Sequence, residues 1–248
     1  MSATIDVLNP EDPKKVLMIA SNPTISRQTG WPIGFWASEL IHPYYEFTEH
    51  GYHVDISSPR GGKLEVDGFS HPEDRSRYSE DDILSLGFLK SPKHAALIES
   101  TPALLEVNPD EYDAIMVVGG QGPMYTFIDD EDLHRFIADF YEAGKVTCVI
   151  CHAVCVLLKT KLSNGKLLAE GKTWTGFANS EEDYADTFVG KKIQPFRIED
   201  QARQIPNTNF LVQSRFKPFA LRDGNLITGQ QQYSGLEAAK LVIEALGV

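Results

Sequence analysis

The sequence predicts a doubly wound α/β fold, in which helices cover both faces of a mostly parallel sheet, with an added lid insertion. Apolar runs at 15–21, 53–59, 114–120 and 146–151 are short and continuous, as expected of strands buried on both faces. Longer segments with helical spacing separate them and supply the crossovers that parallel strands require. No repeat, low-complexity tract or linker interrupts this pattern, so we expect residues 1–248 to form a single domain.

The first half of the chain holds two predicted strands, one covering helix and the insertion. The strands are KVLMIAS (15–21) and HVDISSP (53–59). Between them, GFWASELIHPYYEFTEHG (34–51) has the length and apolar spacing of a helix, which Pro43 is expected to kink. The segment from about 60 to 105 is too long for an ordinary connection, so we expect it to form a lid or an oligomer contact.

The second half of the chain continues the alternation of predicted strands and helices. AIMVVGG (114–120) and VTCVIC (146–151) are the next two strands, and DLHRFIADFYEAGK (132–145) between them is predicted to be helical. Two apolar runs on either side of Asp223-Gly224 predict a hairpin. GLEAAKLVIEALGV (235–248) is then predicted to close the fold as an amphipathic helix.

Composition excludes two classes of partner. The chain has 248 residues with 23 basic and 35 acidic side chains, and its formal net charge of −12 repels nucleic acid and anionic membranes. The apolar run within residues 1–21 is too short and too late for a signal peptide, and no apolar stretch is long enough to span a bilayer. We therefore expect a cytoplasmic protein with no nucleic-acid or membrane partner.

All three cysteines lie in TCVICHAVCVLL (147–158). Cys151 falls where a predicted strand meets a predicted helix, at the carboxyl edge of the sheet where open α/β folds bind ligands. There the helix macrodipole is expected to stabilise a thiolate, and the sharp turn is expected to expose it as a nucleophile. Cys148 and Cys155 are interpreted as small apolar residues that fill space.

Metal and redox interpretations of the same stretch are weaker. It holds four zinc-ligand side chains: Cys148, Cys151, His152 and Cys155. A strand, a junction and a helix would point them in different directions, so we predict no metal site. A thioredoxin-type pair would place both cysteines at a helix start rather than one inside a strand, so we expect reduced thiols. His42 and His53 have no comparable context and are interpreted as structural.

Two further stretches fit a nucleophile at this position. In VVGGQGPMYTF, Gly119, Gly120 and Gly122 follow a strand and can turn their amide N–H groups toward a ligand. Paired with a cysteine on a neighbouring strand, they predict an oxyanion hole. In WASELIHP, Glu39 is either a solvated carboxylate or a buried acid whose raised pKa lets it donate a hydrogen bond to the thiolate.

Five motifs occur in a recognisable order: GFWASELIHPYYEF, VVGGQGPMYTF, VICHAVCVLL, TGFANSEE and LITGQQQYSG. Together they resemble the DJ-1/PfpI superfamily, and most closely its Hsp31-like, glyoxalase III-type branch. FLKSPKHAALIESTPALLEVNPDEYDAI resembles the lid of that branch and the strand after it, so the match covers nearly the whole chain. The resemblance implies a flavodoxin-like sandwich that dimerises and converts methylglyoxal to D-lactate without glutathione or metal.

The resemblance also implies roles for individual residues. Cys151 matches the family nucleophile, and His152 matches the histidine beside it that acts as general base. Glu39 matches the carboxylic acid that contacts the nucleophile. Glu182 in TGFANSEE matches the acidic residue that orients the histidine, although Glu181 next to it leaves that assignment open.

The remaining implied features concern the substrate. The amides of Gly120 and His152 would hold the developing oxyanion, and Gly119 and Gln121 belong to the same substrate-binding loop. The implied substrate is a small carbonyl compound, the reaction needs no cofactor, and the implied assembly is a homodimer.

The sequence departs from the branch around the expected pocket. GGQG stands in place of GGHG, CHAV in place of Cys-His-Gly-Pro, and QQQYSG in place of Asn-Pro-Ala-Ser. A different carbonyl, amide or nitrile-like substrate therefore stays open. So do two other functions: a divergent cysteine-dependent hydrolase, hydratase or lyase, and a holdase chaperone or oxidant sensor.

Overall fold

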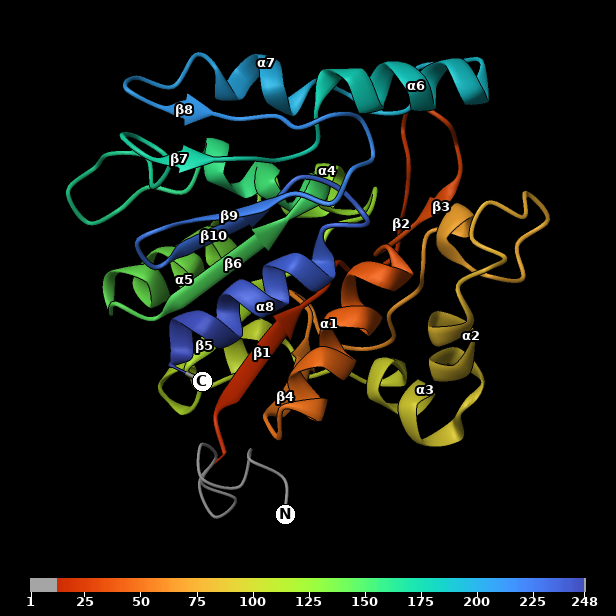
Figure 1. The fold of residues 1–248 in the computed structure, drawn as a ribbon, viewed down its shortest axis with the longest axis horizontal. Helices are drawn as coiled ribbons and strands as arrows, with labels where there is room; N and C mark the ends of the chain where they lie inside the picture. Colours follow the sequence, from red (N-terminus) through yellow and green to blue (C-terminus); the bar gives the residue numbers. More distant parts are fainter. Residues whose placement is uncertain (1–12, 248) are drawn as a thin grey trace.

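The computed structural model describes residues 13–247 (Figure 1). The central sheet has six strands in the order β4-β1-β5-β6-β10-β9. Their bounds are β1 (Lys15–Ile19), β4 (His53–Ser57), β5 (Ala114–Val117), β6 (Val146–Ile150), β9 (Ala220–Asp223) and β10 (Leu226–Gly229). All neighbours pair in parallel except β9, which is antiparallel to β10. The predicted mostly parallel sheet is confirmed, and the predicted hairpin forms with Gly224 and Asn225 in its loop.

Helices cover both faces of this sheet. The three predicted ones are α1 (Ala37–Glu49), α5 (Glu131–Glu142) and α8 (Gly235–Leu246); the others outside the insertion are α4 (Pro123–Thr126), η5 (Cys151–Leu158), α6 (Asn179–Val189) and α7 (Ile198–Ala202). On one face α1 and α8 pack against each other, and α4, α5, η5 and α7 contribute to the core on the other (Figure 1). Pro43 lies inside α1 without ending it.

Residues along β1 alternate between the two cores. Val16 and Met18 belong to the core beneath α1 and α8, whereas Leu17 and Ile19 belong to the core on the opposite face. All four are fully buried. Burial on both faces explains why the run is apolar throughout, and each such side chain contributes about 1.5–3 kcal/mol to folding.

Each of the four predicted strands ends one to three residues before the end of the apolar run that predicted it. The last residues of each run leave the sheet at its carboxyl edge. Gly119 follows β5 in this way, and Cys151 follows β6. The residues that build the candidate site therefore come directly after buried strands, which fix their positions.

The segment 60–105 forms a helical insertion beside α1 (Figure 1). It contains η2 (Gly68–Ser70), α2 (Ile83–Lys90), α3 (Pro92–Glu99) and η3 (Leu104–Glu106), which ends one residue beyond the predicted segment. The short helix η4 (Pro109–Glu111) follows. α2 packs on α1, where the ring of Phe88 is fully buried and meets Tyr44 edge to face at 5.4 Å between centroids. Its role as a lid stays a prediction.

Two small sheets complete the described residues. They are β2 (Thr24–Ile25) with β3 (Pro32–Ile33), and β7 (Thr173–Trp174) with β8 (Asn209–Phe210). Between residues 13 and 247, no helix is long and apolar enough to cross a membrane. The features read from residues 1–12 lie outside the described part of the chain.

Candidate active site

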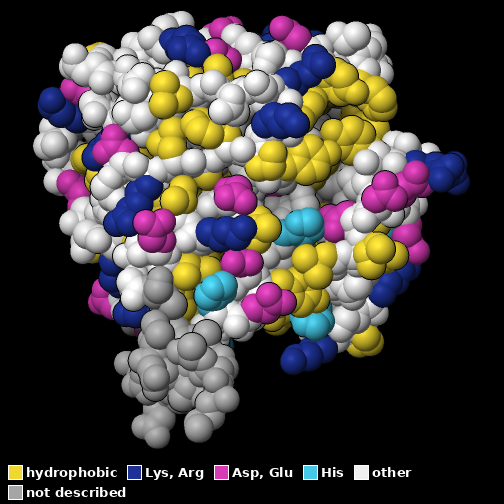
Figure 2. All heavy atoms as spheres, in the orientation of Figure 1, with side chains coloured by type: hydrophobic (Ala, Val, Ile, Leu, Met, Phe, Trp, Pro, Cys, Tyr) yellow, Lys and Arg dark blue, Asp and Glu magenta, His cyan; other side chains and the backbone are white. Residues whose placement is uncertain are grey.

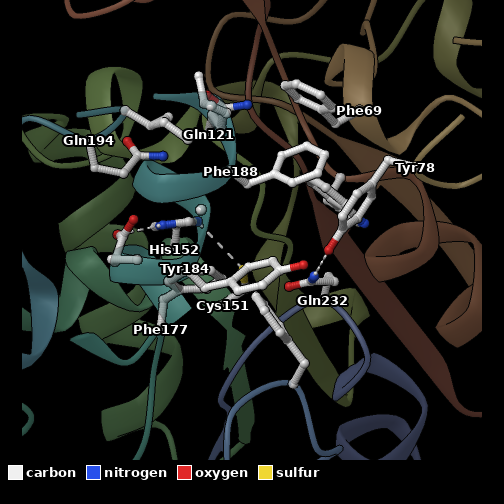
Figure 3. A pocket seen from close by; sticks show the side chains of 16 residues that line it. Phe69, Tyr78, Gln121, Cys151, His152, Phe177, Tyr184, Phe188, Gln194 and Gln232 are labelled. Atoms are coloured by element: carbon white, nitrogen blue, oxygen red, sulfur yellow. Dashed lines mark hydrogen bonds and ion pairs between the residues drawn. The ribbon is translucent and has the colours of Figure 1, made fainter. Parts of the chain in front are cut away.

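Cys151 occupies a sharp turn at the end of β6. Its φ is +55°, a left-handed conformation that costs a residue with a side chain on the order of 1–3 kcal/mol. The helix predicted after it is the 3₁₀ helix η5, which is wound more tightly than an α-helix. The side chain is 2% exposed, and what remains accessible faces a pocket shared with His152 (Figure 3).

Two glycines after β5 let the backbone reach the sulfur. A Cβ on Gly119 would lie 2.5 Å from Oε2 of Glu39 and 2.7 Å from Cβ of Cys151. Gly120 has a φ of +108°, and a Cβ there would lie 2.5 Å from the backbone nitrogen of Trp36. Only glycine fits at both positions. As a result, the backbone amides of Gly120 and His152 lie close enough to the Cys151 sulfur to lower its pKa.

Glu39 lies in the first turn of α1 and is fully buried against the thiol. Its Oε2 accepts a hydrogen bond from the N–H of Gly119 at 3.0 Å. Oε1 has no well-aligned hydrogen-bond partner among the described residues, but the carboxyl contacts Cys151. Burial raises the pKa of Glu39 to about 7. Of the two predicted alternatives, the buried acid is therefore the correct one.

The predicted low pKa of Cys151 is wrong. Burial raises the thiol pKa well above its usual range, and the neighbouring charge of Glu39 raises it further. The amides of Gly120 and His152 act in the opposite direction but are outweighed. The macrodipole expectation overlooked desolvation, which cannot be read from the local sequence, so the resting sulfur is a thiol that must lose its proton to react.

His152 is placed to take that proton. Its Nε2 lies 3.0 Å from Oε1 of Glu182, and its Nδ1 lies 3.6 Å from the sulfur of Cys151 (Figure 3). A carboxylate only accepts hydrogen bonds, so Nε2 carries the proton and Nδ1 presents its lone pair to the thiol. The ring of Phe177 stacks on the imidazole at 4.0 Å between centroids and fixes its plane.

The two adjacent acids at the start of α6 have different partners. Glu182 is 2% exposed and meets His152. Glu181 instead accepts hydrogen bonds from the N–H groups of Ala178 and Phe216, both at 3.0 Å, and from Gln230 at 2.8 Å. The assignment left open by the sequence therefore falls geometrically to Glu182, and Glu181 braces the surrounding loops.

Asp67, in the insertion, is a site residue that sequence reasoning missed. It is fully buried, and its carboxylate accepts the N–H of Gly34 at 2.9 Å and the N–H of Gln121 at 2.6 Å. Burial raises its pKa to about 6. The side chain ties the glycine loop to the segment before α1 and so positions the Gly120 amide. Nothing in the sequence distinguishes it from the other acids of the insertion.

A second missed residue is Arg197, which stands behind Glu182. Its Nη1 lies 3.9 Å from Oε2 of Glu182, and its Nη2 lies 2.8 Å from both Asp183 and Asp186. It brings positive charge to the buried carboxylate that holds His152. The Arg lies 15 residues beyond Glu182 in the chain and has no motif around it.

The other candidates stay outside the site. Cys148 and Cys155 are fully buried in opposite cores, and burial raises the pKa of each thiol. His42 meets Asp82 at 2.9 Å and His53 meets Asp55 at 3.1 Å, away from the pocket. Within residues 13–247, no three His, Cys, Asp or Glu side chains converge as metal ligands would.

Comparison with known proteins supports the relationships read from the sequence. The model of the DJ-1/PfpI family matches residues 33–245. The probable glutathione-independent glyoxalase hsp3103 of Schizosaccharomyces pombe is 27% identical over 236 residues, covering 86% of this chain and 90% of its own. The glutathione-independent glyoxalase HSP31 of Saccharomyces cerevisiae is 26% identical over 250 residues, covering 94% and 98%.

A solved structure has a similar fold over nearly the whole chain. The Rapid Encystment Protein 24 kDa of Francisella tularensis superimposes with a TM-score of 0.84 at 28% identity, covering 95% of this chain and all of that one.

Proposed function

The chain belongs to the DJ-1/PfpI family, and from that premise we propose that it is an enzyme that converts a 2-oxoaldehyde to a 2-hydroxy acid through the thiol of Cys151, without glutathione or another cofactor. Relatives named glutathione-independent glyoxalases support the reaction class. The observation that carries the proposal is the relay from Glu182 through His152 to Cys151.

The first step forms a carbon–sulfur bond. Nδ1 of His152 takes the thiol proton while the sulfur of Cys151 attacks the aldehyde carbon. The carbonyl oxygen becomes an alkoxide, which the N–H groups of Gly120 and His152 beside the sulfur would stabilise by donating hydrogen bonds. The imidazolium then returns the proton to the oxygen, giving a neutral hemithioacetal.

The second step moves hydrogen between adjacent carbons. Neutral His152 removes the proton from the former aldehyde carbon, which gives an enediolate, and delivers that proton to the neighbouring carbon. The hydroxyl proton of the former aldehyde carbon passes to the oxygen of the neighbouring carbon, so that the first carbon becomes the thioester carbonyl. The product is the thioester of a 2-hydroxy acid. Water then cleaves the thioester, releases the acid and restores the thiol, so the net change is addition of one water to the oxoaldehyde.

Glu39 adds an acid beside the sulfur at the end of this relay. With a pKa of about 7, it can hold or release a proton next to the sulfur at neutral pH. A protonated carboxyl stabilises negative charge on sulfur by donating a hydrogen bond, whereas a carboxylate opposes that charge. We therefore expect the protonated form to support thiolate attack and release.

Two other functions remain alternatives. A cysteine-dependent hydrolase, hydratase or other lyase would use the same relay on a different substrate. The oxidant-sensor alternative is less favoured, because the raised thiol pKa leaves little of the thiolate that oxidants attack. The homodimer and the cytoplasmic location implied by the family resemblance stay predictions.

The test is turnover of methylglyoxal by variants of two cysteines. Cys151→Ala is expected to lower the rate of methylglyoxal loss and lactate formation at least a thousandfold, because it removes the attacking atom. Cys155→Ala is the matched control: that thiol donates to the carbonyl oxygen of Pro123 and does not line the pocket. Substantial lactate formation by folded Cys151→Ala would refute the proposal.

A further inference from the structure

The pocket above Cys151 has aromatic walls. Six of its lining side chains are Trp36, Phe69, Tyr78, Tyr184, Phe188 and Phe216. Figure 3 labels Phe69, Tyr78, Tyr184 and Phe188 among them. They come from the start of α1, from the insertion, from α6 and from the loop after β8. None of these segments is adjacent in sequence to the nucleophile, so the fold has gathered aromatic rings around it.

The rings form one continuous rim. Phe188 lies 6.4 Å from Phe69 and 6.2 Å from Tyr78 between centroids, which joins α6 to the insertion. Tyr184 continues the rim to Phe216 at 5.3 Å. Phe188 is 57% exposed and Tyr184 is 39% exposed. In Figure 2, apolar side chains gather at the upper right, where Figure 1 places α6.

The mouth of the pocket adds aromatic surface beyond the thiol. The cavity volume is about 80 Å³, which holds several waters at roughly 10–15 Å³ each and therefore accommodates methylglyoxal, which has five non-hydrogen atoms. A molecule of that size on the thiol would leave the exposed rings of Phe188 and Tyr184 in contact with water. A ring on the substrate would cover these side chains and gain the stabilisation of stacked and edge-to-face contacts.

The inner pocket is polar in places but has no Lys or Arg among its lining residues, and the one carboxylate, Glu182, is paired with His152. A cation lies at the rim, where the guanidinium of Arg215 is 4.6 Å from the centroid of the Tyr184 ring. An anionic group seated in the inner pocket would be desolvated without a Lys or Arg partner. The polar lining is instead made of glutamine amides. Gln194 lines the pocket and is 2% exposed, and its Oε1 has no hydrogen-bond partner among the described residues, so the amide is available to a hydroxyl group of a bound molecule.

We propose that the substrate is an uncharged aromatic 2-oxoaldehyde, with its ring against the Phe188 side of the pocket and a hydroxyl group on the ring hydrogen-bonded to the Gln194 amide. This inference rests on the proposed function and names the substrate class of the same site. The chemistry is unchanged: the aldehyde carbon bonds to Cys151, one water is added, and an aryl 2-hydroxy acid is released.

The first test compares substrates on the wild-type protein. We expect kcat/KM for phenylglyoxal to exceed that for methylglyoxal at least tenfold, after each is divided by the rate at which the aldehyde adds to dithiothreitol. 4-Hydroxyphenylglyoxal should be better still, and 4-carboxyphenylglyoxal should be at least tenfold worse than phenylglyoxal. A ratio of one or below for phenylglyoxal over methylglyoxal would overturn the proposal.

Variants locate the preference in the pocket. Phe188→Ala should lower kcat/KM for phenylglyoxal severalfold more than for methylglyoxal. Gln194→Met, which keeps the side-chain length, should abolish the advantage of the hydroxyl group over the unsubstituted ring. Leu105→Ala is the control, since Leu105 is 72% exposed and does not line the pocket. If Phe188→Ala lowered kcat/KM for both aldehydes equally, the rim would have no part in selecting the ring.

A binding measurement separates this inference from the proposed function. In Cys151→Ser, saturation-transfer NMR should show acetophenone binding at least tenfold more tightly than acetone. If no 2-oxoaldehyde is consumed but acetophenone binds more tightly than acetone, the proposed reaction is refuted and the preference of the pocket for an aromatic ring is supported. If both ketones bind equally, the aromatic pocket has no preference for rings and the inference fails.

Discussion

Glu39→Gln tests the buried acid beside the nucleophile through protein stability. Gln has nearly the shape of Glu and can still accept the Gly119 N–H, but it does not ionise. The pKa of Glu39 is raised from its usual 4.5 to about 7 by burial. Because the folded-state pKa is the higher one, its contribution to stability is fully present below pH 4.5 and is lost as pH rises to about 7.

The magnitude follows from these two pKa values. At about 1.4 kcal/mol per pH unit, the whole shift corresponds to roughly 3 kcal/mol. Between pH 5 and pH 8, ionisation of Glu39 should lower the free energy of unfolding by about 2.5 kcal/mol, since part of the loss occurs below pH 5. The Gln variant should lack this decline.

The assay is urea unfolding at pH 5 and pH 8 for the wild type, Glu39→Gln and the control Glu244→Gln, whose side chain is exposed at the end of α8. Only the difference between wild type and variant is interpreted, because Asp67 also has a raised pKa and contributes in all three proteins. If the pH dependence of wild type and Glu39→Gln were parallel, Glu39 would not be an acid of raised pKa.

Two further predictions concern the relay and the loop beside it. Glu182→Gln should lower kcat for the aldehyde about a hundredfold with little change in KM, because an amide at this position can donate to Nε2 of His152 and move the ring proton to the nitrogen that faces Cys151; unchanged kcat would exclude Glu182 from orienting the ring. Asp67→Asn places one amide donor against the N–H of either Gly34 or Gln121, so urea unfolding should show a loss of about 1–3 kcal/mol. Its kcat should fall about tenfold as Gly120 moves; loss of stability with full kcat at a temperature where the variant is folded would make Asp67 purely structural.

The approximate positions of the buried strands and the Cys151 junction were predictable because they depend on local patterns. A strand buried on both faces is continuously apolar, and a chain that leaves such a strand must do so at the sheet edge. The motifs around Gly119, Cys151 and Glu39 carried enough specificity to identify the family before any coordinates. The boundaries were less accurate, because the predicted strands extended into the turns that build the site, and local patterns did not show that the helix after Cys151 is of the 3₁₀ type.

Only the tertiary structure decided which groups interact and how they ionise. Glu182 rather than Glu181 meets His152, and Asp67 reaches Gln121 across 54 positions of sequence. The aromatic pocket likewise joins rings from α1, the insertion and α6. The sequence contains the thiol and the acid, but their pKa values depend on water excluded by all the surrounding elements. Desolvation is a property of the complete packing, which explains why the local macrodipole argument predicted the wrong direction for Cys151.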